Sequence, residues 1–372
     1  MIMAATPLPP ARPDAEIILC VSAKDGLIAI PVGEKYSYGH TALRSTGAFE
    51  KQKAGVHILH DLSAMPSVMP ALIQAAKLYR VALTTSSRPY LGDYTQELVS
   101  RLPGTWTATF EVYAHPVWQE DWIPLLWDNG ELTEAMERCR VPYGAVLTSS
   151  TGAELLLIKQ PGGAGRYLLG ACASSTFDDN YDNPFAPAAI ALPASPRLAA
   201  AQVTSRFLPT YERAVHERLL AEVENAHRQL EDLRRPGGLD GGAVHGSRVG
   251  HTADHDAESS AAVLRRLRPH AAHLLVRTLE AAAPSQEEGA ALDRLAVLLG
   301  SERGERPASV FRAPAPLPPA SADDVRRWLA DAPVLLKHAR AALPPAPENG
   351  SRKALASAPR ALAAPTASGR GR

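Results

Sequence analysis

The sequence predicts an α/β to α+β fold, with a mixed β-sheet domain over residues 15–210 and helices after it. A strand, a helix and a second strand follow one another over about 30 residues, the size of a βαβ unit. Farther along, short turns connect strands and force antiparallel neighbours. Of the aromatic residues, 18 precede residue 211. Because aromatic side chains dominate protein cores, we expect the principal core in this first part.

The first predicted elements are two strands that form a hairpin. Residues 17–22 and 27–32 are rich in isoleucine, leucine and valine, and Asp25-Gly26 lies between them. Asp-Gly between two apolar runs is a strong short-range signal for a hairpin turn.

A βαβ unit is predicted next. Residues 56–59 form an apolar run, the apolar side chains of residues 68–79 recur at helical spacing, and residues 81–85 favour a strand. Such a unit is normally right-handed, and its two strands are parallel.

The rest of the first domain is predicted to alternate short helices with an antiparallel meander. Pro103-Gly104 ends one helix, and glycine-rich or serine-rich turns separate the later strands. The predicted helices span residues 93–101, 121–128 and 131–140, and the predicted strands span residues 105–113, 143–148, 154–159, 167–173 and 188–192.

Residues 211–235 form a predicted amphipathic helix with a coiled-coil-like seam. Its apolar residues step by four and three positions: Leu219, Val223, Ala226, Leu230 and Leu233. The repeat covers two heptads, fewer than a coiled coil usually needs. Two interpretations remain open, packing onto the protein's own core and a homodimer through residues 211–235.

The remaining segments are distinguished by their composition. Residues 236–260 form a Gly/His-rich linker, and residues 261–342 a helical region interrupted at Pro269, with a Pro-rich spacer at 306–320. Ser285 and Ser321 are each followed three residues later by an acidic residue, as in a capping box. We expect disorder at residues 1–14 and in the basic tail, residues 343–372.

Charge and cysteine content restrict the class of protein. The formal net charge is zero, which argues against a protein that coats nucleic acid with its whole surface. No stretch approaches the ~20 apolar residues of a membrane span. The three cysteines are far apart, which argues against a disulfide framework. Because the N-terminus also lacks the apolar segment of a signal peptide, we expect a soluble, cytoplasmic protein that does not bind membranes.

The candidate catalytic residues are His57, His60 and Asp61, which follow the first strand of the predicted βαβ unit. Ligands of open α/β sheets bind at the carboxyl ends of strands, so this group could bind a metal or act as acid and base. On a strand, however, His57 and His60 point to opposite faces. The alternative is a partly buried His57, with His60 and Asp61 at the start of the next helix.

Two segments hold candidate metal ligands. His251 and His255 have the HxxxH spacing that brings two imidazoles to one helix face, but the glutamate of a zincin is missing. Asp178 and Asp182 belong to an acidic segment that lacks the glycine and the final carboxylate of an EF-hand. A solvated linker and an acidic turn are the alternatives, and the sequence identifies no cofactor.

Two further clusters suggest binding surfaces. Trp118, Trp122 and Trp127 crowd one segment and either form an exposed aromatic patch or fill a core. A basic stripe consists of Arg265, Arg266, Arg268 and Arg277. Together with the basic tail, this stripe would bind nucleic acid weakly.

The sequence favours a non-catalytic protein-interaction or regulatory protein, because it holds no complete catalytic constellation. Its helical and Pro-rich segments suit contact with a protein partner. The alternative is a hydrolase-like or metal-assisted enzyme with its site near His57, His60 and Asp61, and a second alternative is a weak nucleic-acid binder.

Overall fold

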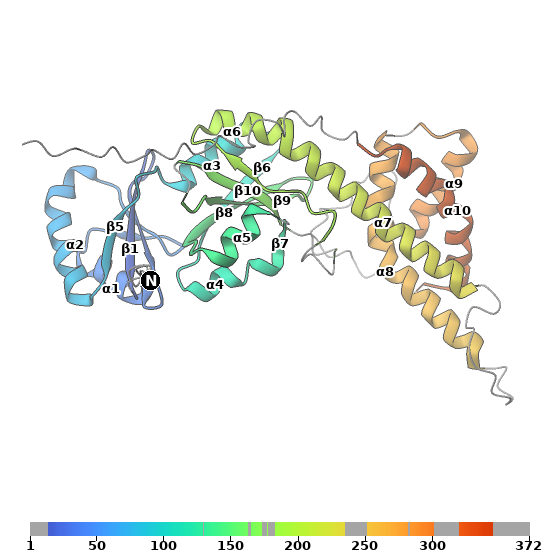
Figure 1. The fold of residues 1–372 in the computed structure, drawn as a ribbon, viewed down its shortest axis with the longest axis horizontal. Coiled ribbons are helices and arrows are strands. Elements are labelled where there is room, and N and C mark those ends of the chain that lie inside the picture. Colours follow the sequence, from blue (N-terminus) through green and yellow to red (C-terminus); the bar gives the residue numbers. More distant parts are fainter. Residues whose placement is uncertain are drawn as a thin grey trace, which may run out of the picture.

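The computed structural model describes residues 14–128, 130–162, 165–172, 177, 183–234, 251–281, 283–300 and 320–344, of which residues 251–259 only as backbone. Figure 1 shows three parts in a row along the long axis: a first sheet with helices, a second sheet with helices, and a helical bundle. In this described part, no helix is long and apolar enough to cross a membrane.

The first sheet has the strand order β3-β4-β2-β1-β5. β1 and β2 form the predicted hairpin, with Ser22 opposite Gly26. Gly26 has a φ of +89°, and a Cβ there would lie 2.4 Å from the carbonyl oxygen of Leu59, so this turn requires glycine. The strands are β1 (Glu16–Ser22), β2 (Gly26–Val32), β3 (Glu50–Lys51), β4 (His57–Leu59) and β5 (Ala82–Thr85).

The predicted βαβ unit is present as β4, α2 (Met65–Tyr79) and β5. β5 is parallel to β1, and β4 runs the same way because two antiparallel pairings separate it from β1. Two strands therefore lie between β4 and β5 in the sheet. α1 (Tyr36–Ser45), which the sequence analysis missed, packs with α2 against one face of this sheet.

The other face of the first sheet packs toward the second sheet, whose order is β11-β10-β9-β8-β6, with β7 beside β10. All its pairings are antiparallel, which confirms the meander. The α+β class is thus confirmed, with the strands divided between two sheets. The strands are β6 (Trp106–Val112), β7 (Leu126–Trp127), β8 (Tyr143–Ser149), β9 (Glu154–Lys159), β10 (Tyr167–Cys172) and β11 (Ile190–Leu192).

Helices cover both faces of the second sheet. α3 (Leu91–Val99) and α6 (Pro196–Gln202) pack on one face, and α5 (Glu131–Arg138) packs on the other, next to α4 (Pro116–Glu120). The helix predicted over residues 121–128 is wrong. Pro124 lies in a 3₁₀ turn, and Leu126 and Trp127 instead pair with β10.

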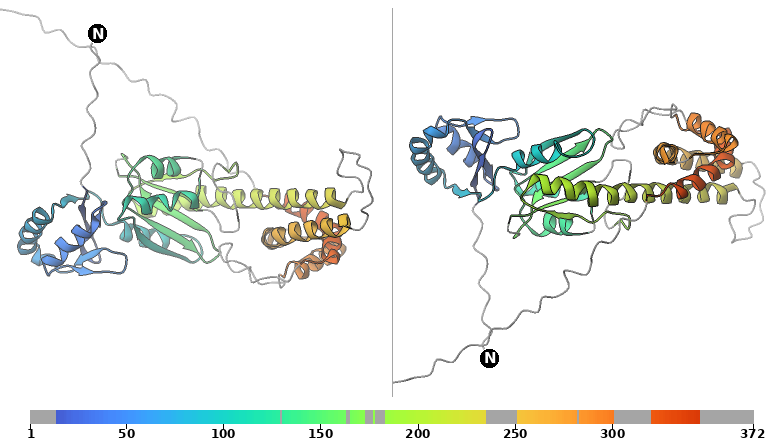
Figure 2. Two further views of the ribbon diagram at one scale, coloured as in Figure 1. Left: turned by 90° about the horizontal axis from the view of Figure 1, so that it is seen from below. Right: turned by 90° about the horizontal axis from the view of Figure 1, so that it is seen from above.

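α6 continues through a π-helical turn (Val203–Phe207) into α7 (Leu208–Arg234), which leads from the second sheet into the bundle (Figure 2). Leu219, Val223 and Leu230 of its seam are buried, and α7 packs against α8 and α10 of the same chain. This is the first of the two interpretations of the seam. A homodimer through residues 211–235 would have to use the outer face of α7 and stays a prediction.

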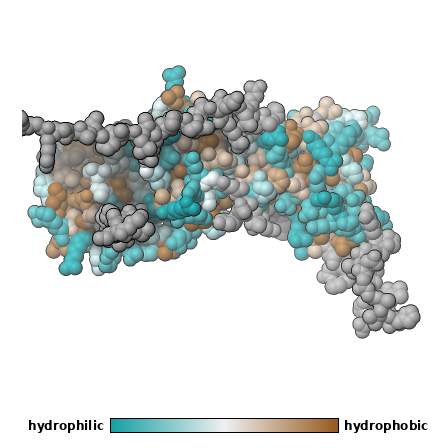
Figure 3. Space-filling model, in the orientation of Figure 1, coloured by the Kyte–Doolittle hydropathy of each residue, from teal (hydrophilic) through white to brown (hydrophobic). Residues whose placement is uncertain are grey.

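The bundle is completed by α8 (His251–Ala281), α9 (Gln286–Leu298) and α10 (Ala322–Ala341). α8 begins inside the segment predicted as a linker, and it continues through Pro269 without the predicted interruption. The capping boxes at Ser285 and Ser321 are both present. On the face shown in Figure 3, hydrophilic residues cover most of the bundle, as expected of helices whose apolar seams face inward.

Several predicted segments lie outside the described residues. They are the N-terminal residues 1–13, the linker residues 236–250, the Pro-rich residues 306–319 and the tail from residue 345.

Candidate small-anion pocket

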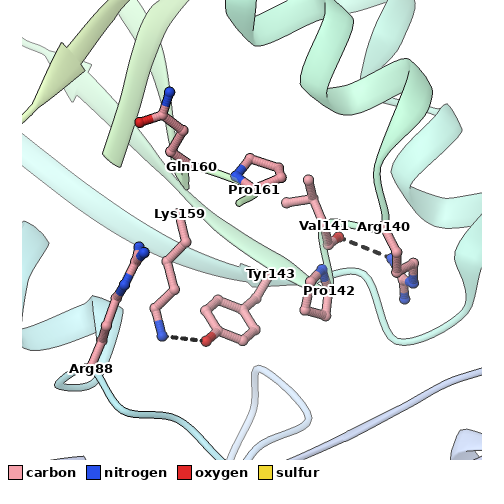
Figure 4. A pocket seen from close by; sticks show the side chains of 8 residues that line it. All are labelled: Arg88, Arg140, Val141, Pro142, Tyr143, Lys159, Gln160 and Pro161. Atoms are coloured by element: carbon pink, nitrogen blue, oxygen red, sulfur yellow. Dashed lines mark hydrogen bonds between the residues drawn. The ribbon is translucent and has the colours of Figure 1, made fainter. Parts of the chain in front are cut away.

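A pocket of about 230 Å³ lies where the two sheets meet, at the start of β8 and the end of β9 (Figure 4). We call the first sheet with α1, α2 and the segment after β5 the first unit, and the second sheet with its covering helices the second unit. Arg88 belongs to the first unit, and the rest of the lining belongs to the second unit. Pockets for drug-sized ligands measure ~300–1,000 Å³, so this pocket suits a smaller molecule. Its lining residues are Arg88, Arg140, Val141, Pro142, Tyr143, Lys159, Gln160 and Pro161.

Lys159, the last residue of β9, extends its side chain from the second sheet toward the first unit. Its Nζ donates hydrogen bonds to Tyr143 Oη at 2.6 Å and to Ser86 Oγ at 2.9 Å. Burial lowers the pKa of Lys159, and the charge of Arg88 lowers this pKa further. No carboxylate of the described residues pairs with this ammonium group.

Ser86 and Tyr143 hold the ammonium group of Lys159 in place. Ser86 Oγ also accepts from the backbone N–H of Arg88 at 3.2 Å and donates to the carbonyl oxygen of Arg88 at 3.0 Å. The Ser86 hydroxyl is therefore fully engaged in positioning. Burial raises the pKa of Tyr143, so its hydroxyl is protonated at neutral pH. The Tyr143 hydroxyl oxygen also lies 4.0 Å from Cys20 Sγ.

The two arginines of the lining have different roles. Arg88 Nη1 donates to the carbonyl oxygen of Arg166 at 2.7 Å, and its guanidinium lies over the ring of Tyr167. Arg140 instead ties backbone segments together, with bonds to the carbonyl oxygens of Ala114 at 3.1 Å and of Val141 at 2.9 Å. Arg140 thus holds the wall of the pocket together, whereas Arg88 and Lys159 lie beside each other in the lining (Figure 4).

The lining defines what this pocket can bind. Among the described residues it contains cations and no carboxylate, and Val141, Pro142 and Pro161 add apolar surface. Burial disfavours the charged form of the half-buried Lys159, and an anion beside its ammonium group would offset this cost. The arrangement therefore suits a small anion with a short apolar body.

The structure does not gather His57, His60 and Asp61 around one point. His57 is fully buried, and its Nε2 lies 2.8 Å from Nδ1 of His40. His60 is exposed and lies 3.3 Å from a carboxylate oxygen of Glu50. Asp61 accepts from the backbone N–H of Ser63 and caps the 3₁₀ turn Leu62–Ala64. A catalytic role for these residues stays a prediction.

The structure does not describe the side chains of the candidate metal ligands. Asp178 and Asp182 are outside the described residues. His251 and His255 are on α8, where the structure describes only their backbone. Among the residues whose side chains are described, no group of three or more His, Cys, Asp or Glu could hold a metal ion.

The three clustered tryptophans have different environments. Trp127 is buried in the core, and Trp122 is half-buried against Tyr113. Trp118 is 44% exposed and lies against Tyr36. The core interpretation therefore holds for Trp127, and Trp118 contributes to the surface.

The predicted basic stripe on α8 is only partly available to a ligand. Arg268 is buried 3.2 Å from Asp324, and Arg277 lies 2.7 Å from Glu212. Arg265 and Arg266 are exposed. Weak nucleic-acid binding through Arg265, Arg266 and the tail stays a prediction.

No sequence pattern pointed to Lys159, Tyr143, Ser86 and Arg88. Their separations along the chain, such as 73 residues between Ser86 and Lys159, form no local motif. The available signal was Lys159 at the end of the apolar run 155–158, where a charged residue ends a buried strand.

The structure defines an α+β protein with two sheets, a helical bundle and a small pocket whose described lining carries cationic side chains. Comparison with models of protein families, with curated proteins and with solved structures found no match to this chain.

Proposed function

We propose that this chain is a non-catalytic regulatory protein that binds a small anion in the pocket between its two sheets. The observation that carries the proposal is the half-buried ammonium group of Lys159, which has Arg88 beside it and no carboxylate in the described lining. An anion is the ligand that this charge distribution favours.

The position of the pocket supports a regulatory role. Arg88 and Ser86 follow β5 of the first unit, and Tyr143 and Lys159 belong to the second unit. A ligand at Lys159 would therefore contact both units, and its binding free energy would favour the arrangement in which they close around it. The same contacts support binding over catalysis, because the hydroxyl of Ser86 is engaged in positioning and no imidazole or carboxylate lies in the described lining.

The test is anion binding by the full chain and by Lys159→Met, with Lys77→Met as control because Lys77 is an exposed residue of α2. Acetate and inorganic phosphate are titrated at constant ionic strength, and binding is followed by calorimetry and by the melting temperature. We expect at least one anion to bind the wild type, with ~10-fold or greater weakening in Lys159→Met and no change in Lys77→Met.

Two results would overturn the proposal. One is wild-type protein that binds neither anion. The other is a Lys159→Met variant that keeps the native circular dichroism spectrum and binds as tightly as the wild type.

A further inference from the structure

We propose that two copies of this chain associate by pairing their β6 strands antiparallel, which joins their second sheets into one continuous sheet. This inference concerns a surface other than the pocket and does not depend on the proposed function. It rests on which residues of β6 direct their backbone groups away from β8, on the exposure of β6 and on its sequence.

β6 is the edge strand of the second sheet, because it pairs with β8 and with no other strand of the described residues. Tyr113 N–H donates to the carbonyl oxygen of Pro142 at 2.9 Å, and Thr105 accepts from the N–H of Ser150 at 2.9 Å. In an antiparallel ladder, residues that bond to a given neighbour alternate with residues that do not. The odd-numbered residues of β6 therefore point their backbone groups toward β8.

The even-numbered residues point their N–H and C=O groups to the open side. These are Trp106, Ala108, Phe110 and Val112, and their backbone groups have no partner on that side in the described part of the chain. Just beyond the strand, the carbonyl oxygen of Ala114 accepts from Gly33 N–H at 2.8 Å. The open edge thus ends at Val112.

The edge is accessible and lacks the usual protection. None of the seven residues of β6 is buried, and Thr107 and Thr109 are exposed. Natural edge strands are commonly kept apart by lysine, proline, bulges or short length. β6 has no lysine, proline or glycine, and Glu111 is its one charged residue. The opposite edge strand, β11, is by contrast three residues long.

The sequence of β6 is complementary to itself. In the antiparallel register that overlaps all seven residues, Thr109 lies on the two-fold axis. Trp106 then faces Val112, Ala108 faces Phe110, and Thr107 faces Glu111, so no like charges are directly opposite. Aromatic residues opposite β-branched ones, and threonine opposite threonine, stabilise such pairs. The even-numbered residues, whose backbone groups are open, fall opposite one another, so a second copy can complete the ladder.

The first test uses charge at the two-fold axis. Thr109 forms a pair without backbone hydrogen bonds there, in which side chains approach most closely. We expect the wild type to approach twice its mass of 39.7 kDa in sedimentation equilibrium as its concentration rises. Thr109→Glu alone should stay at 39.7 kDa, because it places two glutamates opposite each other. An equimolar mixture of Thr109→Glu and Thr109→Lys should recover the double mass.

The second test uses proline at the open edge. Ala108→Pro removes an N–H that points away from β8, which an edge strand tolerates. We expect Ala108→Pro to keep the wild-type melting temperature within a few degrees and to lose the dimer. Thr109→Pro removes an N–H bonded to β8, so it should lower the melting temperature. The contrast between the two variants shows which backbone N–H groups face β8 and which face the open side.

Three results would overturn the inference. The wild type could remain a monomer at all concentrations, a folded Ala108→Pro could remain a dimer, or the mixture of charged variants could fail to associate. Each result would show that β6 does not pair with a second copy.

Discussion

At the scale of single residues, two ionisable side chains lose hydration without gaining an opposite charge. Lys159 and His57 are both desolvated, and in both cases burial lowers the pKa of the side chain. For Lys159 the proposed consequence is a site for an anion. His57 is the first residue of β4 and is buried beside His40. For His57 the consequence is a dependence of stability on pH.

Burial lowers the pKa of His57 to about 4, and nearby His40, Lys51 and Arg44 act in the same direction. The unfolded chain protonates this histidine near pH 6.5, so between pH 6.5 and about 4 the unfolded state binds more protons. The stability that His57 contributes is fully present above pH 6.5 and is lost as the pH falls toward 4. The loss amounts to at most about 3 kcal/mol.

The measurement is urea unfolding between pH 4 and pH 7.5 for the wild type, His57→Gln and His60→Gln. His57→Gln should make the decline in the free energy of unfolding shallower. Part of the slope should remain, because burial also lowers the pKa of four other histidines, which are His40, His216, His227 and His273. The exposed His60 serves as control, and its variant should keep the wild-type slope. An unchanged slope in His57→Gln would contradict the assignment.

At the scale of elements, local patterns specified most strands and helices. The Asp-Gly turn, the meander and both capping boxes were predicted from the residues that form them. α1 was missed because it buries only Gly39, Ala42 and Leu43, so its apolar periodicity is weak. β7 was missed because the pairing of Leu126 and Trp127 with β10 is a long-range contact.

The seam of α7 gives a prediction at this scale. Leu219 is fully buried against the bundle, whereas Leu233, at the far end of the same seam, is 38% exposed. Leu219→Ala should lower the free energy of unfolding by ~2–5 kcal/mol, and Leu233→Ala by less than about 1 kcal/mol. Chemical denaturation measures both. Equal losses would show that the seam is buried along its whole length, as in a dimer through residues 211–235.

At the scale of the whole molecule, the first sheet and the helical bundle lie at opposite ends, with the second sheet between them (Figure 1). The residues that line the pocket come from the second sheet and from the segment after β5 (Figure 4). With an anion bound, we expect amide hydrogen exchange to slow at residues 86–88 of the first unit and at the adjoining ends of β8 and β9. Exchange in α9 and α10 should not change. Mass spectrometry of peptides with and without the anion gives the measurement, and slowing confined to the second sheet would contradict a ligand that bridges the units.

The sequence by itself determined the α+β class, the aromatic-rich first part and most local elements, because turns, caps and periodicity act over a few residues. Only the tertiary structure decided that the strands divide between two sheets and that the α7 seam packs within the chain. It alone brought Ser86, Tyr143 and Lys159 together and left β6 at an edge. The physical reason is that desolvation of Lys159 and the free side of β6 depend on neighbours that are distant in the sequence.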